Sequence, residues 1–315
     1  MSARAPLAPD RVDARVNLGG IALRNPVLTA SGTFGYGTEF APFLDLRRLG
    51  GIVSKSLTVA PRTGNLPARI AETASGMLNA IGLENVGVEA FVREKLPALH
   101  PDVVVVASVF GTEMEHYAQV CARLEGEPRV AGFEINASCP HVKSGGIEFG
   151  QRADVLAELV RTVRRAARKP LLVKLSPNVT SIAEMARVCE GEGADGLSLV
   201  NTLQALDVDV ETRRPLLRNV LGGLSGPAIR PVALRMVFQA SHAVKIPICG
   251  IGGIETAEDA IKFLLCGATA VQVGTANYRN PAVAGEIADG IRAHAARHGF
   301  ARVADLVGAL EVPGV

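Results

Sequence analysis

The chain has 315 residues, of which 48% are hydrophobic and 20% are charged, with abundant glycine and no tryptophan. These proportions are typical of a soluble α/β enzyme and exclude a disordered or fibrous chain. The formal net charge is +2 and no basic run is interleaved with aromatic residues, so the sequence predicts no nucleic-acid partner.

The five cysteines are odd in number and widely scattered, and no two of them have the C-x-x-C spacing. The sequence therefore predicts neither a disulfide framework nor a zinc or iron–sulfur site within this chain. The longest apolar stretches, such as residues 103–110, are too short to span a membrane, and residues 1–10 lack the apolar core of a signal peptide. We therefore expect a reduced, cytoplasmic protein that does not bind membranes.

The predicted elements begin with a hairpin, in which residues 14–16 and 21–23 flank a glycine-containing turn. Eight short β-branched runs follow as predicted strands, at residues 27–30, 51–54, 103–108, 130–136, 171–175, 196–201, 247–250 and 270–274. Helical patterns separate many of them, at residues 112–124, 152–167, 181–192, 227–243, 256–265 and 281–298. Several of these segments open with a Ser, Thr or Asp cap or an early Pro, as helices do.

Nearly continuous apolar runs are typical of parallel strands that are covered on both faces. Alternating β and α units predict a parallel sheet, and eight such units predict its closure into a (β/α)8 TIM barrel of the α/β class. We expect the hairpin to close one end of this barrel and the basic segment 161–169 to be a solvated helix face. No linker or low-complexity tract divides the chain, so we expect a single domain over residues 1–315.

Two glycine-bearing turns follow the last two predicted strands, at residues 250–254 and 274–276. Backbone N–H groups at such turns, together with a helix N-terminus, form a cradle for a phosphate group. Glycine is needed there because a side chain would block the close approach of the ligand. The pattern predicts a phosphate site and leaves open which phosphate ligand it holds, and two ordinary turns are the alternative.

Two lysines, Lys55 and Lys174, stand at strand ends where side chains point into the mouth of the barrel. A buried ammonium group is costly unless it meets an anion, an electron-rich ring or a carboxylate. Two such cations beside a phosphate cradle suit a flavin that becomes anionic on reduction, together with a carboxylate substrate. Lysines that extend into solvent are the alternative interpretation.

The other polar residues near these strand ends are amides and a hydroxyl rather than acids, namely Asn79, Asn136, Asn201 and Thr202. Amides supply donors and acceptors without charge, which suits a planar cyclic imide or ureide. Cys139 lies just past the fourth predicted strand, where a thiol can act as a general base. A small buried residue is the alternative for Cys139, and a surface position is the alternative for His141.

These motifs together resemble the class 1 dihydroorotate dehydrogenases, and within them the NAD-linked (class 1B) branch, from about residue 16 to the C-terminus. The resemblance rests on the order and spacing of A-S-G-T-F-G-Y-G at 30–37, S-K-S-L-T at 54–58, G-M-L-N-A-I-G-L-E-N at 76–85, N-A-S-C-P at 136–140, N-T at 201–202, G-G-L-S-G-P at 222–227 and the two glycine turns. It implies oxidation of (S)-dihydroorotate to orotate in pyrimidine biosynthesis.

The resemblance also implies roles for single residues. Cys139 corresponds to the base that removes the C5 proton, while FMN accepts the C6 hydride. The expected FMN contacts are Ser31, Lys55, Ser56, Ser108, Asn136, Lys174, Val200, Gly226, Gly252, Gly253, Gly274 and Thr275. The expected substrate contacts are Lys55, Asn79, Ala80, Ile81, Gly82, Leu83, Asn136, Asn201 and Thr202.

Two positions depart from the family pattern, because Ser108 and His141 each stand where an Asn is usual. Both keep a hydrogen-bonding group, so the departures bear on affinity and specificity more than on the reaction. A related FMN-dependent dihydropyrimidine oxidoreductase therefore stays open. The glycine turns would also suit a non-redox barrel lyase or isomerase with a phosphorylated substrate, or a barrel that binds a phosphate ligand without catalysis.

The resemblance implies partners as well. Since this chain has no cysteine cluster, electrons that pass from FMN to NAD need a separate subunit, which is expected to carry FAD and an iron–sulfur cluster. A homodimer within a heterotetramer is the expected assembly.

Overall fold

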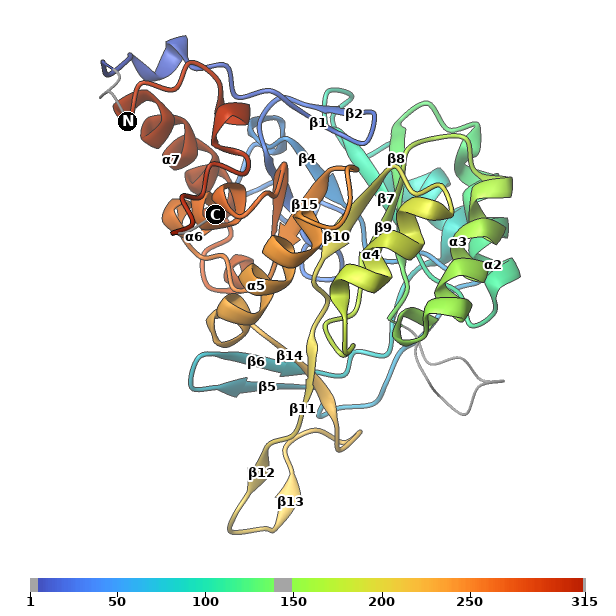
Figure 1. The fold of residues 1–315 in the computed structure, drawn as a ribbon. Coiled ribbons are helices and arrows are strands. Elements are labelled where there is room, and N and C mark those ends of the chain that lie inside the picture. Colours follow the sequence, from blue (N-terminus) through green and yellow to red (C-terminus); the bar gives the residue numbers. More distant parts are fainter. Residues whose placement is uncertain (1–4, 139–148, 314–315) are drawn as a thin grey trace.

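The computed structural model describes residues 5–138 and 149–313, and its centre is a closed barrel of eight parallel strands (Figure 1). Around the barrel the order is β10, β15, β16, β3, β4, β7, β8 and β9. The bounds are β3 (Val27–Thr29), β4 (Gly51–Val53), β7 (Val105–Val109), β8 (Val130–Asn136), β9 (Leu171–Leu175), β10 (Gly196–Leu199), β15 (Ile248–Ile251) and β16 (Ala270–Val273). The predicted (β/α)8 barrel is confirmed, and each predicted strand corresponds to one of these.

The strands form where the sequence is apolar without interruption, because both of their faces are covered. Every residue of β7 and of β9 is buried, including Ser108 and Lys174. A half-exposed strand would show alternating polar residues, whereas a strand between a packed interior and a layer of helices does not.

Helices cover the outside of the barrel, and the six predicted segments all contain one (Figure 1). They are α2 (Met114–Glu125), α3 (Ala153–Ala166), α4 (Ile182–Gly191), α5 (Arg230–Ser241), α6 (Ala257–Leu265) and α7 (Val283–Arg297). Capping fixes two of the starts, since the Ser181 side chain accepts from the N–H of Glu184 and Thr256 forms a capping box with Asp259. Helix α5 begins later than predicted, because residues 227–229 form a 3-10 turn.

Short helical turns lie between the main elements. The 3-10 turns are η1 (Pro9–Arg11), η2 (Leu46–Arg48), η5 (Phe149–Gln151), η6 (Pro227–Ile229), η7 (Thr275–Tyr278) and η8 (Val303–Leu306). The helix α1 (Gly87–Ala90) continues into a π-helical turn, η3 (Phe91–Lys95), before β7. No described helix is long and apolar enough to span a bilayer.

The predicted hairpin closes the amino-terminal end of the barrel. It consists of β1 (Val16–Leu18) and β2 (Ile21–Leu23), so its first strand begins two residues later than predicted. Its buried side chains pack against residues of the barrel interior such as Val106. The turn residue Gly19 has φ +59°, and a Cβ atom there would lie 2.4 Å from the carbonyl oxygen of Asp195, just before β10. This turn therefore requires glycine.

A second sheet, which the sequence did not predict, lies at the opposite end of the barrel (Figure 1). Two insertions, one after β4 and one after β10, pair as an antiparallel sheet in the order β11, β14, β6 and β5. Its strands are β5 (Ile70–Thr73), β6 (Gly76–Asn79), β11 (Leu203–Ala205) and β14 (Gly222–Ser225). The small hairpin of β12 (Val208–Asp209) and β13 (Arg214–Pro215) projects beyond it.

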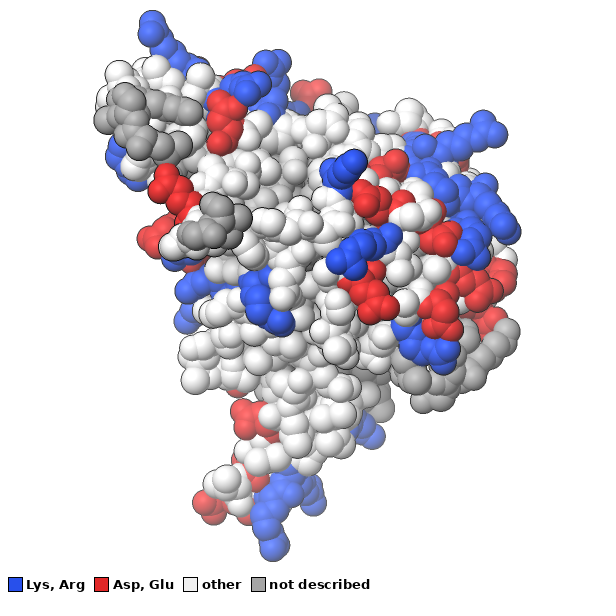
Figure 2. Space-filling model, viewed as in Figure 1, with Lys and Arg blue, Asp and Glu red and all other residues white. Residues whose placement is uncertain are grey.

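On the face shown in Figure 2, Lys and Arg side chains are interspersed with Asp and Glu side chains. In the basic segment of α3, Arg161 pairs with Glu192 at 2.6 Å and Arg164 pairs with Asp195 at 2.7 Å. The predicted solvated face is confirmed at the exposed Arg161 and Arg165, whereas Arg164 is half-buried and the segment beyond Ala166 lies outside the helix.

Phe133, on β8, is fully buried, so we expect its truncation to destabilise the protein strongly. Phe133→Ala should lower the free energy of unfolding by about 3–5 kcal/mol, because it removes buried apolar surface and leaves a cavity. Phe43→Ala is the matched control, since Phe43 is 62% exposed and should change stability by less than about 1 kcal/mol. Urea unfolding followed by circular dichroism measures both, and equal effects would contradict this assignment of the core.

Candidate active site

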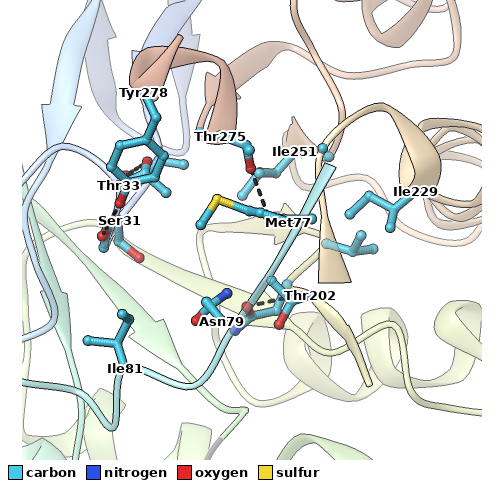
Figure 3. A pocket seen from close by; sticks show the side chains of 18 of the residues that line it. Ser31, Thr33, Met77, Asn79, Ile81, Thr202, Ile229, Ile251, Thr275 and Tyr278 are labelled. Carbon is cyan, nitrogen blue, oxygen red and sulfur yellow. Dashed lines mark hydrogen bonds between the residues drawn. The ribbon is translucent and has the colours of Figure 1, made fainter. Parts of the chain in front are cut away.

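A pocket of about 310 Å³ lies between the carboxyl ends of the barrel strands and the second sheet. In (β/α)8 barrels this end is where active sites are built. Figure 3 shows side chains from both parts of the fold pointing into it, with Asn79 beside Thr202 on one side and Ser31 and Thr33 near Tyr278 on the other.

The structure brings nearly all of the sequence-predicted site residues together in this pocket. All the expected substrate contacts line it. Among the expected FMN contacts, Ser108 alone does not line the pocket. Cys139 and His141 lie outside the described residues.

Ser108 lies beneath the pocket floor and reaches it through one neighbour. Its hydroxyl group shares a 2.9 Å hydrogen bond with that of Ser56, and the Asn136 amide donates to the same Ser56 oxygen at 3.5 Å. The amide of Asn201 in turn donates to Asn136 Oδ1 at 3.2 Å. This chain of neutral groups orients the Asn136 and Asn201 amides from below, and both residues line the pocket.

Lys55 follows β4, is half-buried and lines the pocket. Burial lowers the pKa of the Lys55 ammonium, an effect that Glu84 opposes and Arg69 reinforces. Within the described parts of the chain, its Nζ atom has neither an ion-pair partner nor a hydrogen bond. Such an ammonium attracts a ligand anion, because the anion would stabilise the positive charge in place of the water that burial removed.

Lys174, from β9, is only 5% exposed and stands at the floor of the same pocket. Its Nζ atom lies 3.4 Å from Ser31 Oγ and 3.9 Å from Glu134 Oε1. Of the three partners that the sequence left open for a buried lysine, the structure therefore supplies a carboxylate. Glu134 was not identified in the sequence, since a single acid within the apolar strand β8 gave no signal of its position.

The two glycine turns lie side by side at the pocket wall, as Gly252, Gly253 and Gly274 all line it. Gly252 and Gly253 have φ values of +128° and +71°. A Cβ atom on Gly253 would lie 2.8 Å from the Gly226 carbonyl oxygen. The loop is held from behind, because Arg230 pairs with Asp259 at 2.8 Å and the Asp259 carboxylate accepts from the N–H groups of the residues before α6.

Several pocket residues could not be identified in the sequence because they belong to the unpredicted sheet or carry ordinary side chains. The walls include apolar and hydroxyl groups from Thr33, Ile70, Met77, Ser225, Ile229, Ile251, Ile254 and Tyr278. Asn79 was expected at the end of a barrel strand but ends β6, from which it reaches the pocket from above. Its amide donates to the Gly223 carbonyl at 3.3 Å.

The remaining four cysteines have structural positions. Cys121, Cys189 and Cys249 are fully buried, and burial raises the pKa of each thiol. Cys266 is half-buried at the end of α6. None of these four lines the pocket.

The pocket therefore combines a glycine cradle, two enclosed ammonium groups, a row of neutral amides and apolar walls. Such a lining favours a ligand with a phosphate group, a planar ring and a carboxylate. Among the described residues, no group of three or more His, Cys, Asp or Glu side chains could hold a metal ion.

Comparisons with known proteins agree with this geometry. The sequence model of the family described as dihydroorotate dehydrogenase matches residues 13–294. A dihydroorotate dehydrogenase B (NAD(+)), catalytic subunit, from Pelobacter propionicus is 55% identical over 300 residues, which cover 95% of this chain and 99% of that protein. Proteins of the same description from Geotalea uraniireducens and Geobacter sulfurreducens are each 54% identical, over 95% of this chain and 98% and 99% of their own lengths.

The family model spans most of the chain, and the relatives match it almost from end to end at more than half identity. The chain belongs to the dihydroorotate dehydrogenase family, which confirms the resemblance of its motifs and the enzyme class that they predicted.

Proposed function

We propose that the pocket binds one FMN and that, with this flavin bound, the chain oxidises dihydroorotate to orotate in pyrimidine biosynthesis. The observation that carries the proposal is the convergence of Lys55, Lys174 and the glycine cradle of Gly252 and Gly253 on one pocket. Family membership supports the same activity.

Different parts of the pocket lining suit the phosphate and the ring system of FMN. The backbone of the two glycine turns suits the phosphate, since side chains there would fill the space that the phosphate oxygens need. Apolar walls such as Ile251 and Ile254 suit a planar ring system. Lys174 supplies a positive charge at the floor of the pocket, where a ring that gains negative charge on reduction is stabilised.

The remaining polar residues suit the substrate. Lys55 pairs with the carboxylate of dihydroorotate, and Asn79, Asn136 and Asn201 with Thr202 bind its imide and ureide groups. Backbone and side-chain atoms of Ala80, Ile81, Gly82 and Leu83 enclose the ring. FMN, when bound, supplies the acceptor for the hydride that leaves C6. Cys139 removes the proton from C5, as a thiolate can.

A neutral dihydropyrimidine is the competing substrate, and Lys55 argues against it. Lys55 is half-buried and has no ion-pair partner among the described residues, and a substrate with a carboxylate would provide one. Anaerobic titration with dihydroorotate and with dihydrouracil, followed by the flavin absorbance, tests the proposal. Bleaching by dihydroorotate alone supports it, whereas bleaching by dihydrouracil alone would reassign the substrate.

We further propose that electrons pass to NAD through a separate subunit that carries FAD and an iron–sulfur cluster. The relatives are described as catalytic subunits of an NAD(+) enzyme, which supports a division between two kinds of chain. A homodimer of this chain within a heterotetramer, a single domain over residues 1–315 and a cytoplasmic location complete the proposal.

The cradle predicts that FMN binds through its phosphate. Gly253→Ala should weaken FMN binding by at least about tenfold, since a Cβ there meets the Gly226 carbonyl and strains a residue with positive φ. Binding of riboflavin, which lacks the phosphate, should change far less. Fluorescence titration of the apoprotein measures both ligands, with Gly191→Ala as the control because its Cβ atom would meet nothing within 4 Å. Equal losses for the two ligands would contradict the assignment of the phosphate site.

The role of Cys139 predicts a selective loss of rate. Cys139→Ala should leave FMN bound but slow flavin reduction by dihydroorotate by about 10² or more, as expected when a general base is lost. Cys139→Ser should keep a little activity, shifted to higher pH, because a hydroxyl is a weaker acid than a thiol. Stopped-flow spectroscopy decides the matter, with Cys121→Ala and Cys189→Ala as controls; an unaffected Cys139→Ala rate would exclude Cys139 as the base.

The lowered pKa of Lys55 predicts how the affinity for orotate depends on pH. A bound carboxylate favours the charged ammonium, so binding of orotate raises the lowered pKa of Lys55. Affinity should be constant below the pKa of Lys55 in the free protein and fall as pH rises through it, in a range below the ordinary lysine value of about 10.4. Orotate titration of the flavin spectrum measures this. The Lys55→Met variant should bind orotate weakly, and its affinity should depend on pH only through the titration of orotate itself. An identical pH profile in both proteins would be evidence against a contact between Lys55 and the orotate carboxylate.

A further inference from the structure

A carboxylate lies inside the barrel directly below the pocket. Glu134, on β8, is completely buried, and its Oε2 atom accepts hydrogen bonds from Ser198 Oγ at 2.7 Å and from Gln272 Nε2 at 2.6 Å. Its donors come from β10 and β16, so side chains of three strands meet at this carboxylate. Both contacts are donated to the same oxygen, so two other strands fix the position of the Glu134 carboxylate.

The second oxygen of this carboxylate faces Lys174. Glu134 Oε1 lies 3.9 Å from Lys174 Nζ and has no hydrogen bond within the described parts of the chain. The ammonium is also within 3.4 Å of Ser31 Oγ, at the pocket lining. Lys174 is therefore held between a fixed negative charge below and the ligand space above.

The pair of Glu134 and Lys174 is not expected to add much to the stability of the fold. Removing two charges from water costs about as much as their attraction returns, and apolar side chains of the same volume often stabilise a core as well or better. The two pocket lysines also differ, because Lys55 has no ion-pair partner among the described residues whereas Lys174 has a permanent one. The pair thus has a consequence for the pocket, where it fixes the position of one cation and offsets part of its charge.

We propose that Glu134 is a positioning residue that holds the Lys174 ammonium at the pocket floor and limits the positive charge presented there, and thereby sets the reduction potential of bound FMN. The inference rests on the proposed FMN site. Reduction by dihydroorotate moves a hydride to FMN and a proton to the base, so the ring system gains two electrons and one proton and becomes more negative. A carboxylate beneath Lys174 opposes this gain in charge, while Lys174 favours it.

Glu134→Gln tests the proposal, because glutamine keeps the size and can still accept from Ser198 and Gln272 while it removes the charge. Reduced FMN should bind at least about tenfold more tightly relative to oxidised FMN, which corresponds to a midpoint potential about 30 mV more positive. Anaerobic dye equilibration measures the potential. An unchanged or more negative potential overturns the proposal.

Two further variants separate charge from packing. Ser198→Ala removes one hydrogen bond to Glu134 but not its charge, so it should lower stability and leave the potential where it is. Glu134→Asp keeps the charge but withdraws it from Lys174, so it should shift the potential in the same direction as Glu134→Gln and by less; it also serves if Glu134→Gln fails to fold. A shift in Ser198→Ala equal to that in Glu134→Gln would assign the effect to packing and overturn the proposal.

A double variant tests whether Glu134 acts on the reduction potential through Lys174. Lys174→Met should lower the potential, and adding Glu134→Gln to it should change the potential much less than Glu134→Gln does alone, because the ammonium that Glu134 positions is then absent. A full additional shift in the double variant would show that Glu134 does not act through Lys174. Failure of the wild-type protein to bind FMN would refute the proposed function itself, whereas FMN binding with an unshifted Glu134→Gln potential would refute this inference alone.

Discussion

The pairing of β6 with β14 is the interaction on which the pocket depends. These strands come from two insertions, and Asn79 and Gly223, which lie opposite each other in the register, are 144 residues apart in the chain. The barrel alone would offer an open rim of strand ends. The paired insertions cover this rim, and they turn a shallow end into an enclosed site in which ammonium groups lose much of their water. Small residues make the close approach possible, since a Cβ atom on Gly76 would lie 1.9 Å from the Ser225 carbonyl oxygen.

The barrel could be predicted from sequence because its signal is local and repeated. Each strand is a short apolar run, and each of the six long helices follows a visible cap or periodic face. The sheet over the pocket has no such signal: β5 alternates between exposed and half-buried residues, and β14 begins with two glycines. Its strands are stabilised by partners far away in sequence, and a pattern within one segment does not contain that information.

The candidate site also divides into features that could be predicted from the sequence and features that could not. Lysines, amides and glycines at strand ends could be identified, because the fold class specifies that strand ends converge. What those residues contact could not be identified, and Glu134 is the clearest example. Within β8 it is one acid among apolar residues, and only the closed barrel shows that Ser198, Gln272 and Lys174 surround it. Ser108 illustrates the converse, since it was expected beside the flavin but lies one hydrogen bond below the pocket, behind Ser56.

The hairpin of β1 and β2 has a consequence for the order of events at the other end of the barrel. The hairpin and the packed side chains of the barrel interior close the amino-terminal end, so ligands of the pocket exchange at the end of the barrel where the carboxyl ends of the strands meet. In a pocket that is closed from below, a component bound at the floor leaves after whatever is bound in front of it. A flavin seated against the glycine cradle would therefore be retained while many substrate molecules come and go in front of it. Its residence time would then reflect the topology of the fold as well as the strength of its contacts.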